Sequence, residues 1–143
     1  GGRTVPMMVM SHQYLLSEEI PEIENYVKKS GKKLPLLRDV DISYYLRQEK
    51  NGFNLGPYEP NCKAHWATED DPMPDDFSFQ LWNDDLDRIE DIVSDAMERV
   101  PLLGTSGVSR IINGPIPYAP DGLPLIGPMP GVENGFEACV FTF

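Results

Sequence analysis

Two short runs of the sequence carry side chains suited to proton transfer, namely His12-Gln13-Tyr14 and Tyr44-Tyr45. Each run lies in a strand-like segment, where side chains alternate between two faces, so His12 and Tyr14 share one face. A partly buried imidazole exchanges a proton near neutral pH, and a phenol can orient a polar group while its ring excludes water. Taken alone, the same residues also fit a core histidine bonded to a backbone carbonyl and ordinary strand aromatics.

Several other kinds of site have no matching motif. The sequence contains no glycine fingerprint for a dinucleotide, no phosphate loop of the Walker type and no Gly-x-Ser-x-Gly elbow. Its two cysteines, Cys62 and Cys139, are far apart and lack metal-ligand spacing, so we expect neither a metal site nor a disulfide framework. A reducing compartment fits this cysteine usage best. His65 lies in a polar stretch and is assigned no role.

The composition limits the classes of protein and partner that fit this chain. The chain has 143 residues, 41% of them hydrophobic and 24% charged, which suits one globular domain. With 23 acidic against 12 basic residues the net charge is −11, and such a surface repels phosphate backbones, so we expect no nucleic-acid partner. There is no long apolar run, so we expect no membrane span. Both ends look cut, and we expect the rest of the same chain as a partner.

The elements expected around these residues mix strands and helices. A strand over 5–17 carries His12, and a strand over 42–50 carries Tyr44-Tyr45. Asn51-Gly52 predicts a tight hairpin turn into a partner strand over 53–55. We also expect a short helix or turn over 21–29, a polar loop over 60–80, and a longer helix from about Leu86, capped by Asn83 or Asp84 and ended by Pro101. The pattern predicts an α+β fold, a largely antiparallel sheet with helices on one face.

The last third of the chain has an unusual composition. After an expected strand over 108–112, ten of the nineteen residues from 113 to 131 are Gly or Pro. Apolar residues are threaded through them, so we expect an ordered loop held against something large and flat, with a turn at Asp121-Gly122. A final buried strand is expected over 136–143.

An ordered series of short motifs then becomes informative. His-Gln-Tyr and Tyr-Tyr-Leu-Arg-Gln-Glu are followed by Gly56-Pro57-Tyr58-Glu59, Met97-Glu98-Arg99-Val100-Pro101, Asn113-Gly114-Pro115-Ile116 and Ala119-Pro120-Asp121-Gly122-Leu123-Pro124. Each motif is weak alone, but together, in this order, they cover nearly the whole chain. The series resembles the flavin-dependent amine oxidoreductases of the D-amino-acid-oxidase superfamily, and within it the dimethylglycine and sarcosine dehydrogenases.

The resemblance implies a division of the chain and a set of site residues. Residues 1–112 would be part of a substrate-binding domain, and 113–143 a truncated segment returning towards an FAD-binding domain. It implies His12 and Tyr44 as catalytic residues and Tyr14 and Tyr45 as substrate-binding ones, with Tyr45 the replacement for Tyr44 if the strand faces the other way. The residues implied to lie against the flavin are Pro120, Asp121, Gly122, Leu123 and Pro124.

The resemblance also implies a reaction. The expected activity is oxidation of an N-methylated glycine, dimethylglycine or sarcosine, by hydride transfer to FAD, most of which is held by absent parts of the chain. Tetrahydrofolate is a further implied cofactor, in an absent C-terminal domain. The substrate's carboxylate needs a cation, for which Arg47 and Arg110 are available. The implied location is the bacterial cytoplasm or the mitochondrial matrix. The alternative is a non-catalytic relative, like the regulatory subunit of pyruvate dehydrogenase phosphatase, acting as a protein-binding module.

Overall fold

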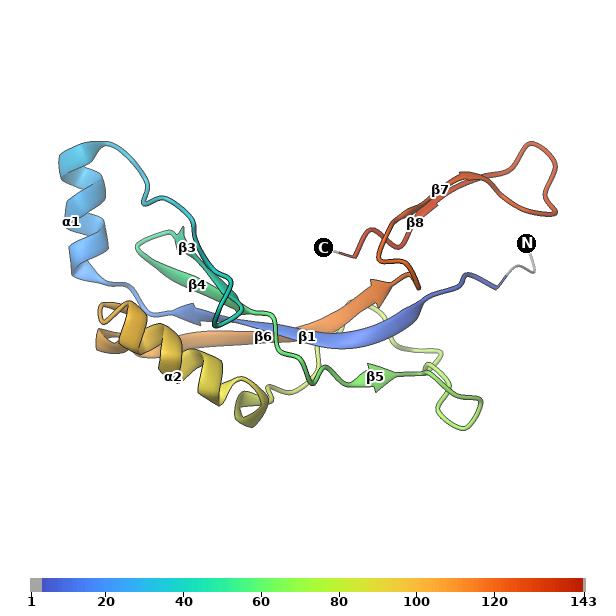
Figure 1. The fold of residues 1–143 in the computed structure, drawn as a ribbon, viewed down its shortest axis with the longest axis horizontal. Coiled ribbons are helices and arrows are strands. Elements are labelled where there is room, and N and C mark those ends of the chain that lie inside the picture. Colours follow the sequence, from blue (N-terminus) through green and yellow to red (C-terminus); the bar gives the residue numbers. More distant parts are fainter. Residues whose placement is uncertain (1–3, 143) are drawn as a thin grey trace. The chain divides into compact units, whose positions relative to one another are not determined.

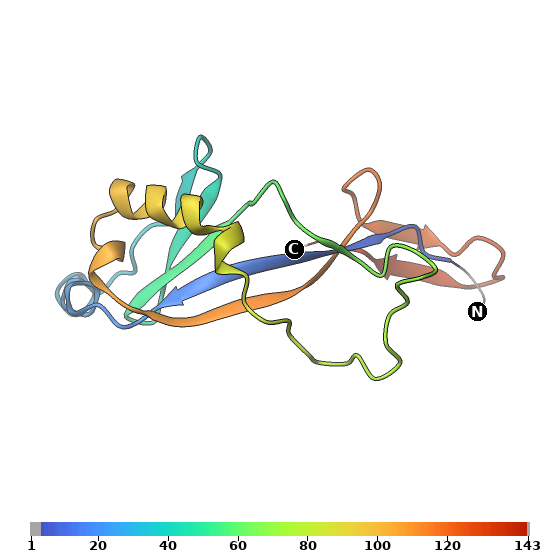
Figure 2. The ribbon, with the colours of Figure 1, turned by 90° about the horizontal axis from the view of Figure 1, so that it is seen from below.

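The computed structural model describes residues 4–142, which form an α+β fold, as expected (Figures 1 and 2). The strands are β1 (Met8–Ser17), β2 (Leu37–Asp39), β3 (Tyr44–Glu49), β4 (Gly52–Pro57), β5 (Ala64–His65), β6 (Val108–Tyr118), β7 (Leu125–Pro128) and β8 (Phe136–Cys139). The helices are α1 (Pro21–Ser30) and α2 (Glu90–Arg99), with short 3-10 turns η1 (Leu86–Arg88) and η2 (Leu103–Thr105). No helix in the described part of the chain is long and apolar enough to cross a bilayer.

The chain folds as two compact units. We call one the core unit; it comprises Gln13–Asn61 and Leu81–Asn113. The other, which we call the cavity unit, comprises the chain up to His12, Cys62–Gln80 and the chain from Gly114 onward. Strands β1 and β6 each contribute residues to both units. His12 therefore belongs to the cavity unit, and Tyr14, Tyr44 and Tyr45 belong to the core unit.

The sheet of the core unit is antiparallel, with β3 between β2 and β4, and β1 on the far side of β4. Tyr45 of β3 lies opposite Arg38 of β2 on one side and Gly56 of β4 on the other. Leu15 of β1 lies opposite Leu55 of β4. Strand β6 also pairs with β1. Alternation along each strand then determines which side chains enter the core.

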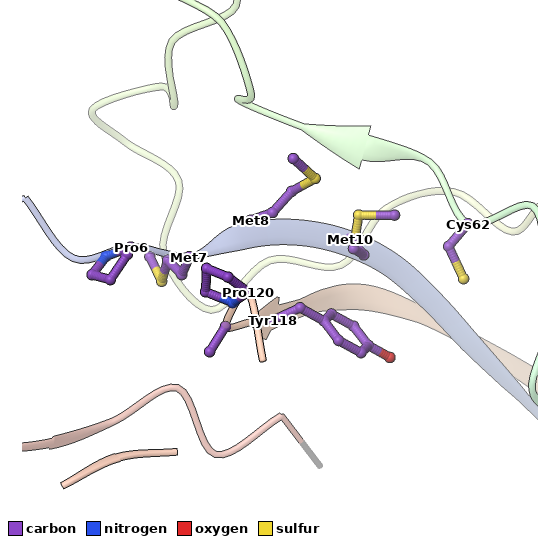
Figure 3. A pocket seen from close by; sticks show the side chains of 8 residues that line it. Pro6, Met7, Met8, Met10, Cys62, Tyr118 and Pro120 are labelled. Atoms are coloured by element: carbon purple, nitrogen blue, oxygen red, sulfur yellow. The ribbon is translucent and has the colours of Figure 1, made fainter. Parts of the chain in front are cut away.

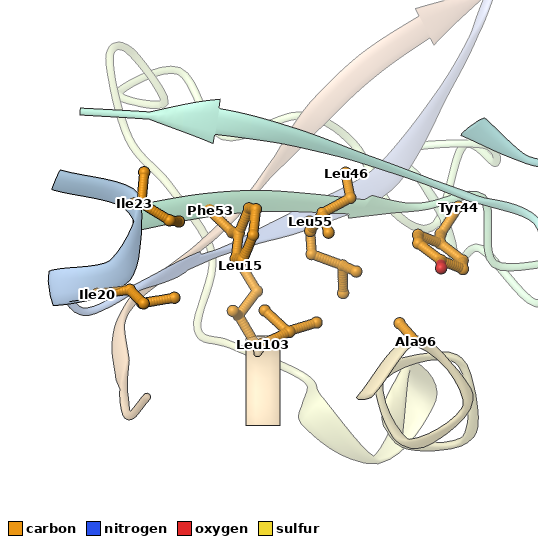
Figure 4. Close-up of a cluster of buried hydrophobic side chains, with 9 residues drawn as sticks. All are labelled: Leu15, Ile20, Ile23, Tyr44, Leu46, Phe53, Leu55, Ala96 and Leu103. Carbon is orange, nitrogen blue, oxygen red and sulfur yellow. The ribbon is translucent and has the colours of Figure 1, made fainter. Parts of the chain in front are cut away.

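One face of this sheet forms the hydrophobic core with the helices (Figure 4). The buried cluster consists of Leu15, Ile20, Ile23, Tyr44, Leu46, Phe53, Leu55, Ala96 and Leu103. Full burial of one such large side chain stabilises a fold by about 1.5–3 kcal/mol. Helix α1 begins at Pro21 and ends at Gly31, whose φ of +67° is the left-handed conformation expected of a glycine cap.

The β3–β4 hairpin is present, but its turn lies one residue earlier than Asn51-Gly52. Glu49 pairs with Gly52, so Lys50 and Asn51 make the turn, and Lys50 takes a φ of +52°. Gly52 has a different task. A Cβ there would lie 2.7 Å from both the Glu18 carbonyl oxygen and the Ser17 hydroxyl, so this glycine permits close approach of the chain after β1.

The expected helix cap at Asn83 or Asp84 is wrong, since α2 begins only at Glu90. The preceding segment is instead held to the strands by buried amide side chains. Gln13 Nε2 donates to the Asp85 carbonyl oxygen at 2.7 Å, and Asn113 Nδ2 donates to the Asn83 carbonyl oxygen at 2.7 Å. These bonds hold residues 83–85 against the strands before η1, a tertiary effect that periodicity alone does not reveal.

The Gly- and Pro-rich stretch contains more regular structure than the loop we expected. Strand β6 continues to Tyr118, and β7 pairs with β8 as an antiparallel hairpin. The expected turn is confirmed: Gly122 N–H donates to the Ala119 carbonyl at 3.0 Å, and Leu123 N–H donates to Asp121 Oδ1 at 3.0 Å. The last strand ends at Cys139 because Val140 takes a φ of +57°, outside the extended region.

Candidate functional site

Tyr44 lies in the hydrophobic core. Its side chain has no exposed surface and packs with Ala96 of α2 (Figure 4). Its hydroxyl has no hydrogen-bond partner among the described residues. Burial, and then the Asp39 carboxylate, raise the pKa of this hydroxyl, while Arg99 opposes the rise. A substrate could touch this ring only if α2 moved away, so Tyr44 fits a packing role and the neighbouring Tyr45 is the better candidate for substrate contact.

Tyr45 points to the opposite face of the sheet, which we call the tyrosine face. Residues that lie opposite each other on neighbouring strands share a face, and so do residues two positions apart on one strand. The same face therefore also carries the cross-strand partners of Tyr45 and the residues two positions away from Tyr45 or from one of those partners. Its members include Tyr14, Leu16, Arg38, Tyr45, Arg47, Asn54 and Gly56, together with Tyr58 just after β4. The tyrosines are half-buried, and both arginines are exposed. Aromatic rings and guanidinium groups thus gather on one face of a chain whose net charge is −11.

The ring of Tyr45 lies across the backbone of Gly56. A Cβ at Gly56 would overlap the Tyr45 ring, so only glycine leaves room for this arrangement. The Tyr58 ring lies next to the Tyr45 ring in a T-shaped contact. The two ring centroids are 5.9 Å apart, at an interplanar angle of 62°. The guanidinium carbon of Arg38 lies 5.0 Å from the Tyr58 centroid, a cation–π contact.

The electrostatics of this face keep Tyr45 neutral. Burial raises the pKa of its hydroxyl, Tyr58 and Tyr14 add to the rise, and Arg47 opposes it. Tyr45 is therefore a hydrogen-bond donor throughout the physiological pH range. Arg47 makes only a half-exposed ion pair with Glu49, 3.4 Å between Nη2 and Oε2, and such pairs are weak and easily exchanged for a ligand.

A buried ion pair fixes the chain just after Tyr58. Glu59 Oε1 lies 3.3 Å from Arg88 Nη2, and the two side chains are 0% and 6% exposed. Arg88 Nη1 also lies 3.8 Å from Asp85 Oδ2. This pair joins the end of β4 to η1, two segments far apart in the sequence, and so positions the Tyr58 ring.

The cavity unit holds an apolar cavity of about 600 Å³ (Figure 3). It is lined by Pro6, Met7, Met8, Met10, Cys62, Tyr118, Ala119 and Pro120. Of the residues expected to lie against a flavin, Pro120 lines this cavity, and the turn that follows is exposed, with Leu123 62% exposed. A Cβ at Gly122 would meet nothing within 4 Å, so none of the described residues packs beside this glycine. His12 is half-buried on β1.

Sequence reasoning gave no role to several members of the tyrosine face. Arg38 was missed because the three-residue strand β2 carries no periodic signal. Tyr58 was part of a family motif but received no role. Gly56 could have been noticed, since a glycine inside a strand often marks a close approach. Arg47, which we considered for a carboxylate, does lie on this face.

Comparison with known proteins places these features in context. The family model described as "DAO: FAD dependent oxidoreductase" matches residues 1–141. Mouse mitochondrial dimethylglycine dehydrogenase is 42% identical over 142 residues, covering 96% of this chain and 16% of the relative. Mouse mitochondrial sarcosine dehydrogenase is 33% identical over 141 residues, covering 99% and 14%. The mitochondrial regulatory subunit of mouse pyruvate dehydrogenase phosphatase is 25% identical, covering 93% and 14%. The chain therefore spans a small part of each relative.

Solved structures support the fold. Glycine oxidase from Geobacillus kaustophilus superposes with a TM-score of 0.64 at 14% identity, covering 96% of this chain and 30% of that one. L-proline dehydrogenase from P. horikoshii gives a TM-score of 0.64 at 17% identity, covering 99% and 32%. At these identities the likeness establishes the architecture alone.

Proposed function

Because this chain belongs to the DAO family of FAD-dependent oxidoreductases, we propose that its protein oxidises an N-methylated glycine, dimethylglycine or sarcosine, at the CH–NH bond. The names of the two more similar dehydrogenases support this substrate class. The observation that carries the proposal is the tyrosine face, where a neutral phenol shares one face of the sheet with two arginines. A small amino acid presents one carboxylate and one amine, and such a face suits both.

The arginines serve the carboxylate. Guanidinium groups match carboxylates in shape and charge, and both arginines share a face with Tyr45. Arg38 lies opposite Tyr45 on β2, and Arg47 lies two residues further along β3. Arg38 is already ordered by its contact with the Tyr58 ring, so little side-chain freedom is lost when an anion binds. The Tyr45 hydroxyl donates a hydrogen bond to the bound substrate.

His12 is the proposed proton acceptor. Hydride can leave the N-methyl carbon only when the nitrogen lone pair is free, so the amine must first lose its proton. Imidazole is suited to accept that proton near neutral pH. FAD, when bound, supplies the hydride acceptor. Residues Pro120–Pro124 would lie against its ring, since the turn is exposed, apolar at Leu123, and open beside Gly122.

Two further parts of the proposal concern the remainder of the protein. The nucleotide half of FAD would be bound outside this chain, which has no dinucleotide fingerprint. Tetrahydrofolate, also bound elsewhere, would take up the released one-carbon unit. The mitochondrial matrix is the proposed location, which the names of the mitochondrial relatives support.

The test uses the full-length protein with FAD bound, mixed anaerobically with one amine at a time. We expect dimethylglycine or sarcosine to bleach the visible flavin absorbance, and glycine, which lacks the N-methyl group, to leave it unchanged. A yellow protein that no amine bleaches would contradict the proposal and favour a regulatory role like that of the phosphatase subunit.

A further inference from the structure

A histidine and a cysteine face each other in the cavity unit. Strands β1 and β5 are antiparallel, and the Ser11 N–H donates to the Lys63 carbonyl oxygen at 2.8 Å. In an antiparallel pair, one step forward along the first strand matches one step back along the second. His12 therefore lies opposite Cys62, at the point where the chain enters β5.

Side chains of cross-strand partners share a face and interact. A ring nitrogen of His12 and the Sγ atom of Cys62 lie within 4.8 Å of each other. Cys62 is half-buried and takes part in no disulfide. An imidazole next to a thiol can accept its proton directly or through one water, and the thiolate is the nucleophilic form of cysteine.

The same thiol lines the apolar cavity (Figure 3). Met8 and Met10 line the same cavity from β1, and Pro120 lines it from the segment after β6. A volume of about 600 Å³ is ample for a small organic molecule. Its walls favour a reagent with an uncharged, apolar body over a charged one, because burial of apolar surface drives entry.

We propose that Cys62 is a reactive thiol, activated by His12, that adds to α,β-unsaturated carbonyl compounds with an apolar body. His12 accepts the thiol proton, and the sulfur forms a bond to the β-carbon. The π electrons of the carbon–carbon double bond move to the α-carbon, which receives a proton in turn. The product is a thioether, and no electrons are gained or lost overall. This reaction needs no flavin, and it shares His12 with the proposed amine oxidation.

The experiment uses the full-length protein and less than one equivalent of either N-ethylmaleimide or N-cyclohexylmaleimide, followed by quenching and peptide mass spectrometry. Cys139, which is also half-buried and outside any disulfide, is the internal control. We expect Cys62 to react on the order of ten times faster than Cys139, because His12 takes up the proton of the Cys62 thiol. The ratio of the two rates should be larger still with the cyclohexyl reagent. His12→Asn should lower the Cys62 rate to that of Cys139 and leave Cys139 unchanged.

Equal rates at the two cysteines, or an unchanged Cys62 rate in His12→Asn, would overturn the proposal. If His12→Asn alters the rates of both cysteines, the variant has disturbed the fold. The comparison of the two reagents on the unmodified sequence then decides, and a rate ratio that does not grow with the apolar reagent counts against the proposal.

Discussion

The ring of Tyr45 lies across the backbone of Gly56, its partner on the neighbouring strand. This contact explains a glycine in the middle of a buried strand, where glycine otherwise weakens the sheet. It also gives Tyr45 a fixed position beside Tyr58, whose ring centroid is 5.9 Å away. The position of the Tyr45 ring on the tyrosine face therefore requires a glycine at residue 56.

Gly56→Ala should therefore displace the Tyr45 ring. The new methyl group would overlap the ring, and overpacking of this kind costs about 1–3 kcal/mol of stability. We expect a lower melting temperature and a several-fold higher KM for the amine substrate. Gly104→Ala is the matched control, because a Cβ there would lie 3.6 Å from its nearest neighbour, an ordinary contact. Equal effects from the two variants would contradict the assignment.

Tyr44→Phe should leave the protein as stable as before or more stable. The hydroxyl it removes is buried without a partner among the described residues, and an unsatisfied buried polar group costs about 1–3 kcal/mol. The pKa of the Tyr44 hydroxyl is raised above its ordinary value of 10.0. Because the folded protein holds this proton more tightly than the unfolded chain does, the titration leaves the free energy of unfolding unchanged below pH 10 and lowers it as the pH rises further. Chemical denaturation between pH 9 and 11 should show a smaller loss of stability for Tyr44→Phe, and a steeper loss would be contrary to expectation.

The buried pair of Glu59 and Arg88 should be sensitive to removal of one partner. Arg88→Met removes the guanidinium group that faces the buried Glu59 carboxylate, and breaking a buried ion pair from one side typically costs about 3–5 kcal/mol. The double variant Arg88→Met with Glu59→Leu should recover much of that loss. The half-exposed Arg47–Glu49 pair serves as a comparison, since removing Glu49 should cost less than about 1 kcal/mol. Denaturant titration of the four proteins measures these differences, and similar losses at both pairs would argue against the buried contact.

Arg38→Met tests recognition of the carboxylate. We expect KM for dimethylglycine to rise about tenfold or more, because a charge-assisted hydrogen bond of about 1.5–3 kcal/mol is lost, with a smaller change in kcat. Lys28→Met removes an equal charge from the exposed surface of α1 and should leave KM unchanged. If Arg38→Met behaves like Lys28→Met in steady-state kinetics, the carboxylate is bound elsewhere.

Much of the fold could be predicted from local patterns, whereas contacts between distant segments could not. The α+β class, the glycine end of α1 and the turn at Asp121-Gly122 follow from propensity and turn chemistry. The segment before α2 is bound by Gln13, which lies 72 residues away in the sequence from the Asp85 backbone that it contacts. The alternation of side chains along a strand correctly predicts that Tyr44 and Tyr45 point to opposite faces of the sheet. Which face the helices cover depends on packing, and that decides which tyrosine a substrate can reach.

The choice between these two tyrosines is the central claim, and the rate of flavin reduction in the full-length protein tests it most directly. Stopped-flow mixing with dimethylglycine under anaerobic conditions would compare Tyr45→Phe, Tyr44→Phe and the unmodified sequence. We expect Tyr45→Phe to slow reduction or weaken substrate binding about tenfold, the loss of roughly one hydrogen bond, and Tyr44→Phe to leave both unchanged. A loss confined to Tyr44→Phe would contradict the assignment of substrate contact to the tyrosine face.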